Sequence, residues 1–265
     1  MKSYLKKNYQ SIISGILAIV FMWLVWFIAY KTIKNEYLVP SFSQTMSALL
    51  VLLTESFFWK ALFYSLLRTV IAFIISFVLA GLLATLCSVI KNATWFVKTI
   101  ISIVRTLPTM AILVLIIYIL NYLKLSRAIA PVIVAILVLF PMMFAQFQTA
   151  INGVDEGLIK AMKVFRLSPK QKVIKVYLPM VCPPIALHIG SNLSFGIKLI
   201  ISAEVMSNIF TSLGGLMQTA SIYEQIPRLI ALTLVAVILG LLIELLAHLA
   251  TVKAFKWAKS EVDND

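Results

Sequence analysis

Hydrophobic residues fall into long blocks along this chain, and polar residues gather between the blocks. Six blocks are long enough to cross the ~30 Å hydrocarbon core of a bilayer as helices, which takes about 20 residues each. These blocks cover residues 11–30, 62–90, 99–120, 128–150, 183–210 and 227–250. The pattern therefore predicts an all-α integral membrane protein, with six transmembrane helices in a single domain over residues 11–250.

The composition excludes the main soluble classes. Of the 265 residues, 62% are hydrophobic and 12% are charged, and the mean hydropathy is +1.01. A soluble domain is about 45–50% apolar and ~25% charged. A soluble enzyme, a disordered chain and a disulfide-stapled secreted module are thereby excluded. The two cysteines, Cys87 and Cys182, stand in apolar surroundings, so we interpret them as small core residues rather than a disulfide or a metal pair.

Positive charge predicts the orientation of the helices. The net charge is +13, from 23 Lys and Arg against 10 Asp and Glu. With the N-terminus in the cytoplasm, most of these cations fall on cytoplasmic segments, as the positive-inside rule requires. We therefore expect a multi-pass protein of the cell (inner or plasma) membrane with both terminal segments, 1–10 and 251–265, in the cytoplasm. We interpret its cations as signals of membrane orientation that lie near lipid. We do not interpret them as a surface that binds nucleic acid.

Two segments near the N-terminus carry further signals. The first apolar block follows a lysine-rich start but is too long for a signal peptide and lacks a small-x-small cleavage site, so we expect a retained anchor. The outer segment 31–61 contains an amphipathic stretch near 43–53. Ser43 is a suitable N-cap for it, which predicts a helix lying along the membrane surface.

The segment 151–182 between the fourth and fifth blocks has the pattern of a helical hairpin. Asp155 and Glu156 place acids at a helix start, where the helix dipole favours them. A stripe of apolar residues then recurs at helical spacing, while three cations lie off the stripe. The stripe consists of Leu158, Ala161, Met162 and Phe165, and the cations are Lys160, Lys163 and Arg166.

A second helix is predicted directly after this stripe. Ser168 is a good N-cap, Pro169 suits the first helical position, and Gln171 completes a capping box. Further on, three prolines are expected to punctuate the return into the membrane: Pro179, Pro183 and Pro184. The apolar stripe of this hairpin either packs back on its own bundle or fills a groove on a cytoplasmic partner.

The run from Lys160 to Pro179 resembles the coupling-loop signature of ABC-importer permeases, which reads roughly E-A-A-x-x-x-G-(A/L)-S followed by an apolar pair and L-P. Further motifs in the same order resemble permeases of the nitrate/sulfonate/taurine type. These motifs are Val39-Pro40-Ser41, Ser65 to Val70, Arg105-Thr106-Leu107-Pro108, Leu139-Phe140-Pro141, Ala203-Glu204-Val205-Met206 and Leu213-Gly214-Gly215-Leu216. Together they cover about residues 38–250.

The resemblance implies the type I ABC-importer permease fold and a two-fold dimer of permease subunits, expected to be identical. It also implies cytoplasmic ATPase subunits, which would bind ATP and Mg, and an extracytoplasmic substrate-binding protein. The ATPase would dock on the coupling loop, with Asp155, Glu156, Leu158, Lys160, Ala161, Met162, Phe165, Arg166 and Ser168 as the candidate docking residues. Three positions depart from the signature, because its glutamate, second alanine and glycine are Lys160, Met162 and Arg166 here.

Ionisable residues inside the apolar blocks are costly and usually face a cavity, a partner or each other. Lys198 and Glu204 are six residues apart, so each needs a partner on another helix. Pro108 is expected to break the third block and to place Arg105 near the break. Such residues are either structural pairs or the lining of a translocation path. The candidates for the path are Arg68, Arg105, Pro108, Lys198 and Glu204, and their excess of cations favours an anionic or zwitterionic solute.

The sequence contains no phosphate-binding loop ending in Gly-Lys-Ser/Thr, and we find no catalytic constellation or metal-ligand cluster. We therefore expect a transport subunit without its own ATPase site, cofactor or metal, and interpret His188 and His248 as packed or helix-end residues. Three alternatives stay open. One is a proton-coupled secondary carrier that uses Glu204 or Glu244. The others are a membrane enzyme and a diverged, non-transporting importer subunit.

Overall fold

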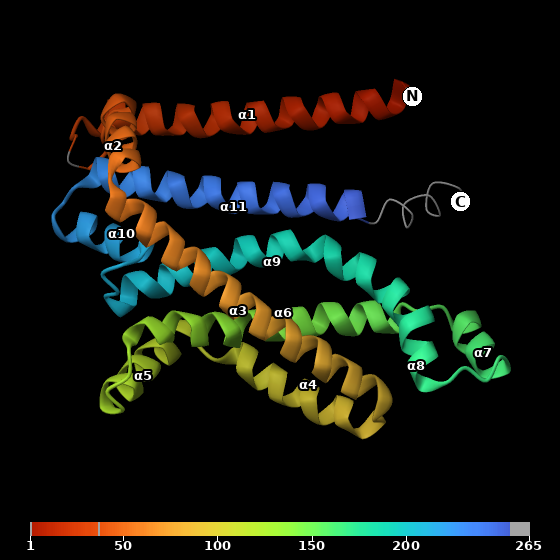
Figure 1. Ribbon diagram of the computed structural model, residues 1–265. Helices are drawn as coiled ribbons and strands as arrows, with labels where there is room; N and C mark the ends of the chain where they lie inside the picture. The colour runs from red at the N-terminus through yellow and green to blue at the C-terminus, as the bar shows by residue number, and fades with distance from the viewer. Residues whose placement is uncertain (1, 37, 255–265) are drawn as a thin grey trace.

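The structure is a computed structural model that describes residues 2–36 and 38–254, and throughout this part its regular elements are helices (Figure 1). In chain order they are α1 (Lys2–Ile33), α2 (Phe42–Thr54), α3 (Ser56–Val89), α4 (Lys91–Thr106), α5 (Thr109–Tyr122), the 3-10 turn η1 (Arg127–Ile129), α6 (Ala130–Asn152), α7 (Glu156–Val164), α8 (Pro169–Lys172), the π-helical turn η2 (Val173–Tyr177), α9 (Leu178–Ser207), α10 (Leu213–Ile222) and α11 (Ile226–Ala254). The all-α expectation is confirmed.

Four helices are long and apolar enough to cross a membrane, namely Ser56–Ser88, Arg127–Asn152, Lys170–Ser207 and Ile226–Ala254. They correspond to the second, fourth, fifth and sixth predicted blocks. The third block is a pair of helices, Thr94–Thr106 and Thr109–Tyr122, bent by 91°. The first block lies within α1, of which Val20–Ile33 is a shorter apolar helix. The described residues therefore contain four spans by length, or five with the bent pair, and the predicted count of six is not confirmed by them.

The bend in the third block follows from Pro108, as expected. Proline has no amide hydrogen and disfavours helical geometry at the preceding residue. Accordingly, α4 ends at Thr106, and Leu107 is extended, with φ −70° and ψ 130°. A new helix, α5, starts at Thr109. The chain therefore turns sharply in the middle of the predicted block 99–120, at the break that Pro108 was expected to cause.

The fifth span begins earlier than the sequence predicted. Instead of breaking at Pro179, Pro183 and Pro184, the helix runs through all three and is continuous with α8. The wide turn η2 precedes the prolines, and the Leu178 amide donates to the Val173 carbonyl five residues back. Because proline clashes with the carbonyl four residues before it, a wider turn upstream relieves the first of these clashes.

The helix after the outer segment is capped two residues earlier than predicted. Ser41, not Ser43, is the N-cap of α2: its hydroxyl accepts from the Gln44 amide, while the Gln44 side chain accepts from the Ser41 amide. Only Ser41 has a glutamine three residues later, whereas Ser43 is followed at that distance by Met46, which cannot complete a capping box.

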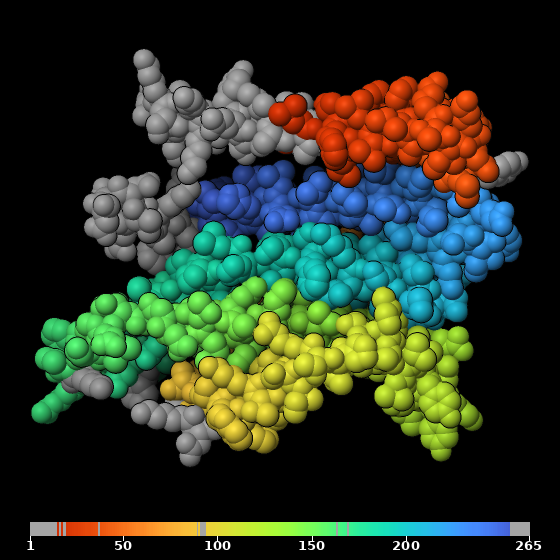
Figure 2. Space-filling model, turned by 180° about the vertical axis from the view of Figure 1, so that it is seen from behind, coloured from red at the N-terminus to blue at the C-terminus, as the bar shows by residue number. Residues whose placement is uncertain are grey.

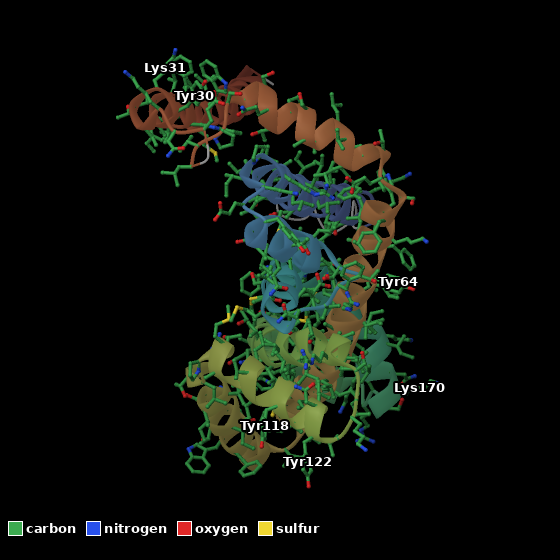
Figure 3. All side chains as sticks on the ribbon, turned by 90° about the vertical axis from the view of Figure 1, so that its left-hand side faces the viewer. Tyr30, Lys31, Tyr64, Tyr118, Tyr122 and Lys170 are labelled. Carbon is green, nitrogen blue, oxygen red and sulfur yellow. The ribbon has the colours of Figure 1, made fainter. Side chains whose placement is uncertain are left out.

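The bundle centres on α3, α6, α9 and α11. In Figure 1, α3 runs diagonally across α6 and α9, and α9 also packs against α10 and α11. The beginning of α1, the end of α11 and the α7–α8 hairpin lie at one end of the molecule. The helices α2 and α10 and the tip of α5 lie at the other end, which faces the viewer in Figure 3, where Tyr118 and Tyr122 project outward from α5.

Close packing of α9 on α11 depends on glycine. Gly190 is buried, and a Cβ atom there would lie 2.9 Å from the Ala247 Cβ and 3.0 Å from the Glu244 carbonyl oxygen. Small residues allow two helix backbones to come close together. In a bilayer, where the hydrophobic effect does not bring helices together, this close van der Waals packing drives their association. By contrast, a Cβ added at Gly15 of α1 would meet nothing within 4 Å.

We expect Gly190→Ala to destabilise the detergent-solubilised protein by about 1–3 kcal/mol, because α9 and α11 must separate to accept the methyl group. Thermal unfolding measures this loss. Gly15→Ala is the matched control and should leave the midpoint unchanged or raise it. Equal midpoints for the two variants would show that the α9–α11 contact is looser than the structure has it.

Candidate functional site

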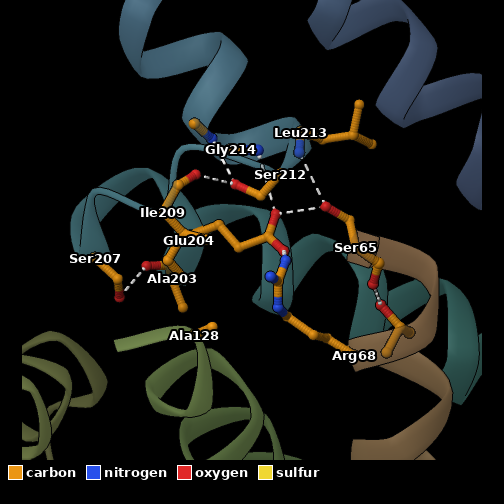
Figure 4. Close-up of polar contacts among 12 residues, drawn as sticks. Ser65, Arg68, Ala128, Ala203, Glu204, Ser207, Ile209, Ser212, Leu213 and Gly214 are labelled. Carbon is orange, nitrogen blue, oxygen red and sulfur yellow. Dashed lines mark hydrogen bonds and ion pairs between the residues drawn. The ribbon is translucent and has the colours of Figure 1, made fainter. Parts of the chain in front are cut away.

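Glu204 of α9 is fully buried and is the centre of a polar network (Figure 4). Its Oε1 accepts from Nη1 of Arg68, on α3, at 2.7 Å. Its Oε2 accepts from the Ser65 hydroxyl at 2.7 Å and from the Gly214 amide of α10 at 3.2 Å. The Ser65 oxygen in turn accepts from the Leu213 amide at 3.0 Å. One carboxylate therefore ties together α3, α9 and the start of α10.

The network leaves no room for a larger residue at the α10 start. A Cβ atom at Gly214 would lie 2.6 Å from the Ile201 carbonyl oxygen and against the Cβ of Glu204 itself. Ser212, the N-cap of α10, accepts from the Gly215 amide at 2.8 Å and donates to the Ile209 carbonyl at 2.7 Å. The Leu213-Gly214-Gly215-Leu216 motif is thus the backbone that lets a helix start contact a buried carboxylate.

Arg68 and Glu204 are therefore partners of each other, on different helices. Neither residue lines the hollows described below. Lys198 is not part of this pair. It is exposed, its stem passes beside Gly240 of α11, and it has no ion pair among the described residues. The structure thus separates buried Glu204 and its partly buried partner Arg68 from the three exposed members of the predicted path, Arg105, Pro108 and Lys198.

Arg105 lies where two hollows meet. The bend cavity, of about 290 Å³, lies beside the break at Pro108 and is lined mainly by apolar residues of α4, α5 and α6, with Arg105, Leu107 and Thr109 at the break. The α4–α6 groove, of about 400 Å³, continues from it along α4 and is lined by Lys98, Ile101, Ser102, Arg105, Pro141, Phe144, Ala145, Gln148, Thr149 and Asn152. Arg105 and Pro141 belong to both.

Sequence reasoning missed most of the polar residues of this groove. Lys98 and Ser102 lie seven and three residues before Arg105, which is the spacing of one helix face. That spacing was visible in the sequence, but Lys98 served only as a topology marker there. A second polar pair, between Gln146 of α6 and Asn192 of α9, lies nearby and exchanges two amide hydrogen bonds of 3.0 and 2.8 Å.

The predicted hairpin is present as α7, a sharp turn and α8. Asp155 caps α7 by accepting from the Leu158 amide at 3.1 Å, and Glu156 lies 3.9 Å from exposed Lys160. Ser168 and Gln171 form the predicted capping box of α8, with hydrogen bonds of 2.9 and 3.3 Å. The helix starts predicted at Asp155 and Glu156 and at Ser168 are confirmed.

The apolar stripe of α7 divides into a covered and an uncovered part. Met162 is buried, and Ala161 is half-buried. Phe165 is 75% exposed, and its neighbour Val164, which the stripe did not include, is 78% exposed. Leu158 is exposed to a lesser degree. The uncovered surface is therefore the end of α7 rather than the whole stripe.

Arg166 occupies the turn between the two helices with φ 48°, the left-handed conformation that favours glycine. The Leu167 amide donates to the Met162 carbonyl across the turn at 3.1 Å. This is the pattern of a Schellman helix end, in which glycine is the usual residue at the left-handed position. The arginine at the signature's glycine position therefore keeps the backbone geometry of glycine at some conformational cost.

We expect Glu204→Leu to destabilise the protein by about 3–5 kcal/mol, because it leaves the partly buried Arg68 charge and the Ser65 hydroxyl and Gly214 amide without their acceptor. The double variant Arg68→Leu/Glu204→Leu should recover part of this loss. Thermal unfolding of the three proteins in detergent provides the comparison. A double variant no more stable than Glu204→Leu alone would show that the two charges are not coupled.

We expect Arg166→Gly to stabilise the turn between α7 and α8 by about 1 kcal/mol. This is the free-energy cost of a left-handed conformation for a residue with a Cβ atom. Arg166→Val should loosen it, because a β-branched residue adopts this conformation least readily. Hydrogen exchange at the Leu167 amide should slow in the glycine variant and accelerate in the valine variant. The same exchange rate in both would contradict the left-handed turn.

Comparison with known proteins assigns this architecture to a family. The sequence model of the family described as binding-protein-dependent transport system inner membrane component matches residues 78–252. A relative from Bacillus subtilis (strain 168), described as putative aliphatic sulfonates transport permease protein SsuC, is 24% identical over 196 residues, which are 74% of this chain and 69% of that protein.

Solved structures share the fold. A chain of an amino acid ABC transporter crystallised with histidines has a TM-score of 0.62 at 18% identity and covers 74% of this chain and 94% of its own length. A chain of a bacterial alginate ABC transporter, in complex with a periplasmic protein bound to an alginate pentasaccharide, has a TM-score of 0.63 at 14% identity, with coverages of 89% and 92%. The chain belongs to the family of binding-protein-dependent transport system inner membrane components, and it has the fold of an ABC-importer permease subunit.

Proposed function

We propose that this permease forms the path for a small anionic or zwitterionic solute, of the nitrate, sulfonate, taurine or vitamin-precursor type, in an ATP-driven importer. The relative named for aliphatic sulfonates supports this substrate class. So does the α4–α6 groove, whose lining includes Lys98 and Arg105 but no acid. The orientation proposed for it places both termini and the α7–α8 hairpin in the cytoplasm, in line with the distribution of cations.

The exposed end of α7 carries the proposal that a separate ATPase drives transport. Val164 and Phe165 present a contiguous apolar surface at the tip of the hairpin. Burying such a phenylalanine in a partner's pocket is worth about 1.5–3 kcal/mol. A helix that ends in an apolar anchor and carries the exposed Lys160–Glu156 ion pair nearer its start suits a groove on a cytoplasmic protein.

The cycle follows from coupling through this hairpin. ATP and Mg bind to the ATPase subunits, closure of the ATPase dimer moves the hairpins of the two permeases, and the bundle opens outward to a substrate-loaded binding protein. Hydrolysis resets the bundle. The permease must contact the two nucleotide states of the ATPase differently, since equal affinity for both would drive nothing. The partners proposed are two ATPase subunits, a second copy of this chain, the binding protein and membrane lipid.

The structure bears on two alternatives. A proton-driven carrier that used Glu204 would need this carboxylate to reach water, but Glu204 is fully buried and accepts three hydrogen bonds. Glu244, the other candidate for such a carrier, is exposed on α11, and the transport assay below decides its role. A diverged subunit that no longer couples would be suggested by the lost signature glycine, but Arg166 keeps the left-handed backbone there. Both observations favour the working importer.

We expect Phe165→Asp to abolish co-purification of the ATPase from native membranes in mild detergent, because a carboxylate at this position must be desolvated on docking. The yield of inserted permease should not change. Trp95→Asp is the matched control: Trp95 is 77% exposed, lies on α4 rather than on the hairpin, and should leave ATPase binding intact.

Two results would contradict this proposal. One is an ATPase that remains bound to the Phe165→Asp variant, which would place the docking surface elsewhere. The other is a protein that purifies alone and moves solute in vesicles along a proton gradient without ATP, which would support the secondary carrier.

A further inference from the structure

The α4–α6 groove has a cationic wall with unused hydrogen-bond donors. Lys98, Ser102 and Arg105 lie on one face of α4, and α4 runs beside α6 on the face seen in Figure 2. From α6, Thr149 and Asn152 reach the same groove. Within the described chain, Lys98, Ser102, Arg105 and Asn152 have no hydrogen bond or ion pair to another side chain. Two cations therefore share a groove without an acid among its lining residues.

The other groove residues are already engaged in packing. The Gln148 side-chain amide donates to the Ala84 carbonyl at 3.0 Å, and the Thr149 hydroxyl donates to the Ala145 carbonyl at 3.0 Å. These bonds hold the α6 wall in place without using the α4 donors. The free donors of the groove are thus concentrated on α4 and at the end of α6, so they can serve a ligand.

The two sides of α4 differ in chemistry. Away from the groove, α4 exposes Phe96, Ile100 and Ile103, which suit lipid. An unpaired lysine and arginine facing lipid in the same way would be strongly unfavourable. The cationic face is therefore expected to face water, and amphipathic α4 separates lipid from an aqueous groove.

The break at Pro108, beside the groove, adds positive potential. At Pro108 the chain bends by 91°, and α5 begins at Thr109 in the bend cavity that Arg105 also lines. The start of a 14-residue helix presents free amides and a partial positive charge. This charge lies near Arg105 and adds to that of the two side chains.

We propose that the α4–α6 groove is a binding site for a small oxyanion, such as a sulfonate, held between Lys98 and Arg105 with hydrogen bonds from Ser102 and Asn152. That the transported solute binds at this site during import rests on the proposed function. The preference of the site for an oxyanion does not depend on that proposal. Charge-assisted hydrogen bonds from two cations favour an oxyanion over a neutral or cationic solute. The groove extends to Asn152, the last residue of α6, and α6 ends on the side of the molecule that carries the hairpin (Figure 1).

Cysteine modification tests this site without a known substrate. Ser102→Cys and Thr149→Cys are made separately in the full-length protein, in a Cys182→Ser background because Cys87 is buried. Ile100→Cys, on the apolar face of α4, is the matched control. Membrane vesicles are treated with an anionic and with a cationic methanethiosulfonate reagent, and each rate is divided by that of a free thiol in solution.

The two groove cysteines should react with both reagents and prefer the anionic one by about tenfold at low salt, since focused positive potential concentrates anions. This preference should shrink at high salt and in Arg105→Gln, which leaves Lys98 as the one cation among the groove's lining residues. Ile100→Cys should not react. Millimolar methanesulfonate should slow modification of Thr149→Cys and lose this effect in Arg105→Gln. Arg105→Lys, which keeps the charge, should retain the preference for the anionic reagent.

Several outcomes would overturn the site. Groove cysteines as inert as Ile100→Cys would show that the face is covered, and a preference for the cationic reagent would contradict an oxyanion ligand. Failure of protection by methanesulfonate, together with unchanged reagent preference in Arg105→Gln, would do the same. If the anion preference holds while no ATPase co-purifies, the site stands and the importer proposal fails. If an ATPase co-purifies but the groove cysteines show no preference for the anionic reagent, the importer proposal stands and the oxyanion site fails.

Discussion

A carboxylate buried inside an apolar helix must be neutralised within the protein, and this constraint organises the bundle. Glu204 meets it with three donors from two other elements, the Arg68 guanidinium, the Ser65 hydroxyl and the Gly214 amide. Because each donor has to lie at hydrogen-bond distance, the positions of α3 and α10 against α9 are fixed together. Leaving a buried charge unpaired costs far more free energy than the ion pair contributes. The network therefore fixes the relative positions of the helices more than it adds to the net stability.

Long apolar elements were predictable from the sequence, whereas local deviations from ideal helices were only partly so. Blocks two, four and six coincide closely with α3, α6 and α11, because length and hydropathy alone define a membrane helix. The break at Pro108 was predicted, but its 91° angle depends on packing. The wide turn at Val173–Tyr177 has no sequence signal apart from the prolines after it. The cap at Ser41 was readable from Gln44, three residues later, and was missed.

The candidate site follows the same division. Helical spacing indicated the α7 stripe and could have indicated the cationic face of α4, since both are local patterns. Spacing could not show that Met162 turns inward while Val164 and Phe165 stay exposed, because burial depends on neighbours remote in sequence. Nor could it pair Arg68 with Glu204, or reveal that Arg166 adopts the backbone conformation of the glycine it replaces.

The Arg68–Glu204 pair also has a consequence for the synthesis of the protein. The two residues are 136 positions apart, and α3 is made long before α9. At about 5–20 residues per second, roughly 7–27 s pass between the translation of the arginine and that of its partner. During this interval the arginine of α3 has no counter-charge in a bilayer, where an unpaired cation is unfavourable. The ion pair forms only once α9 has been made, so the bundle closes as a late event of biogenesis.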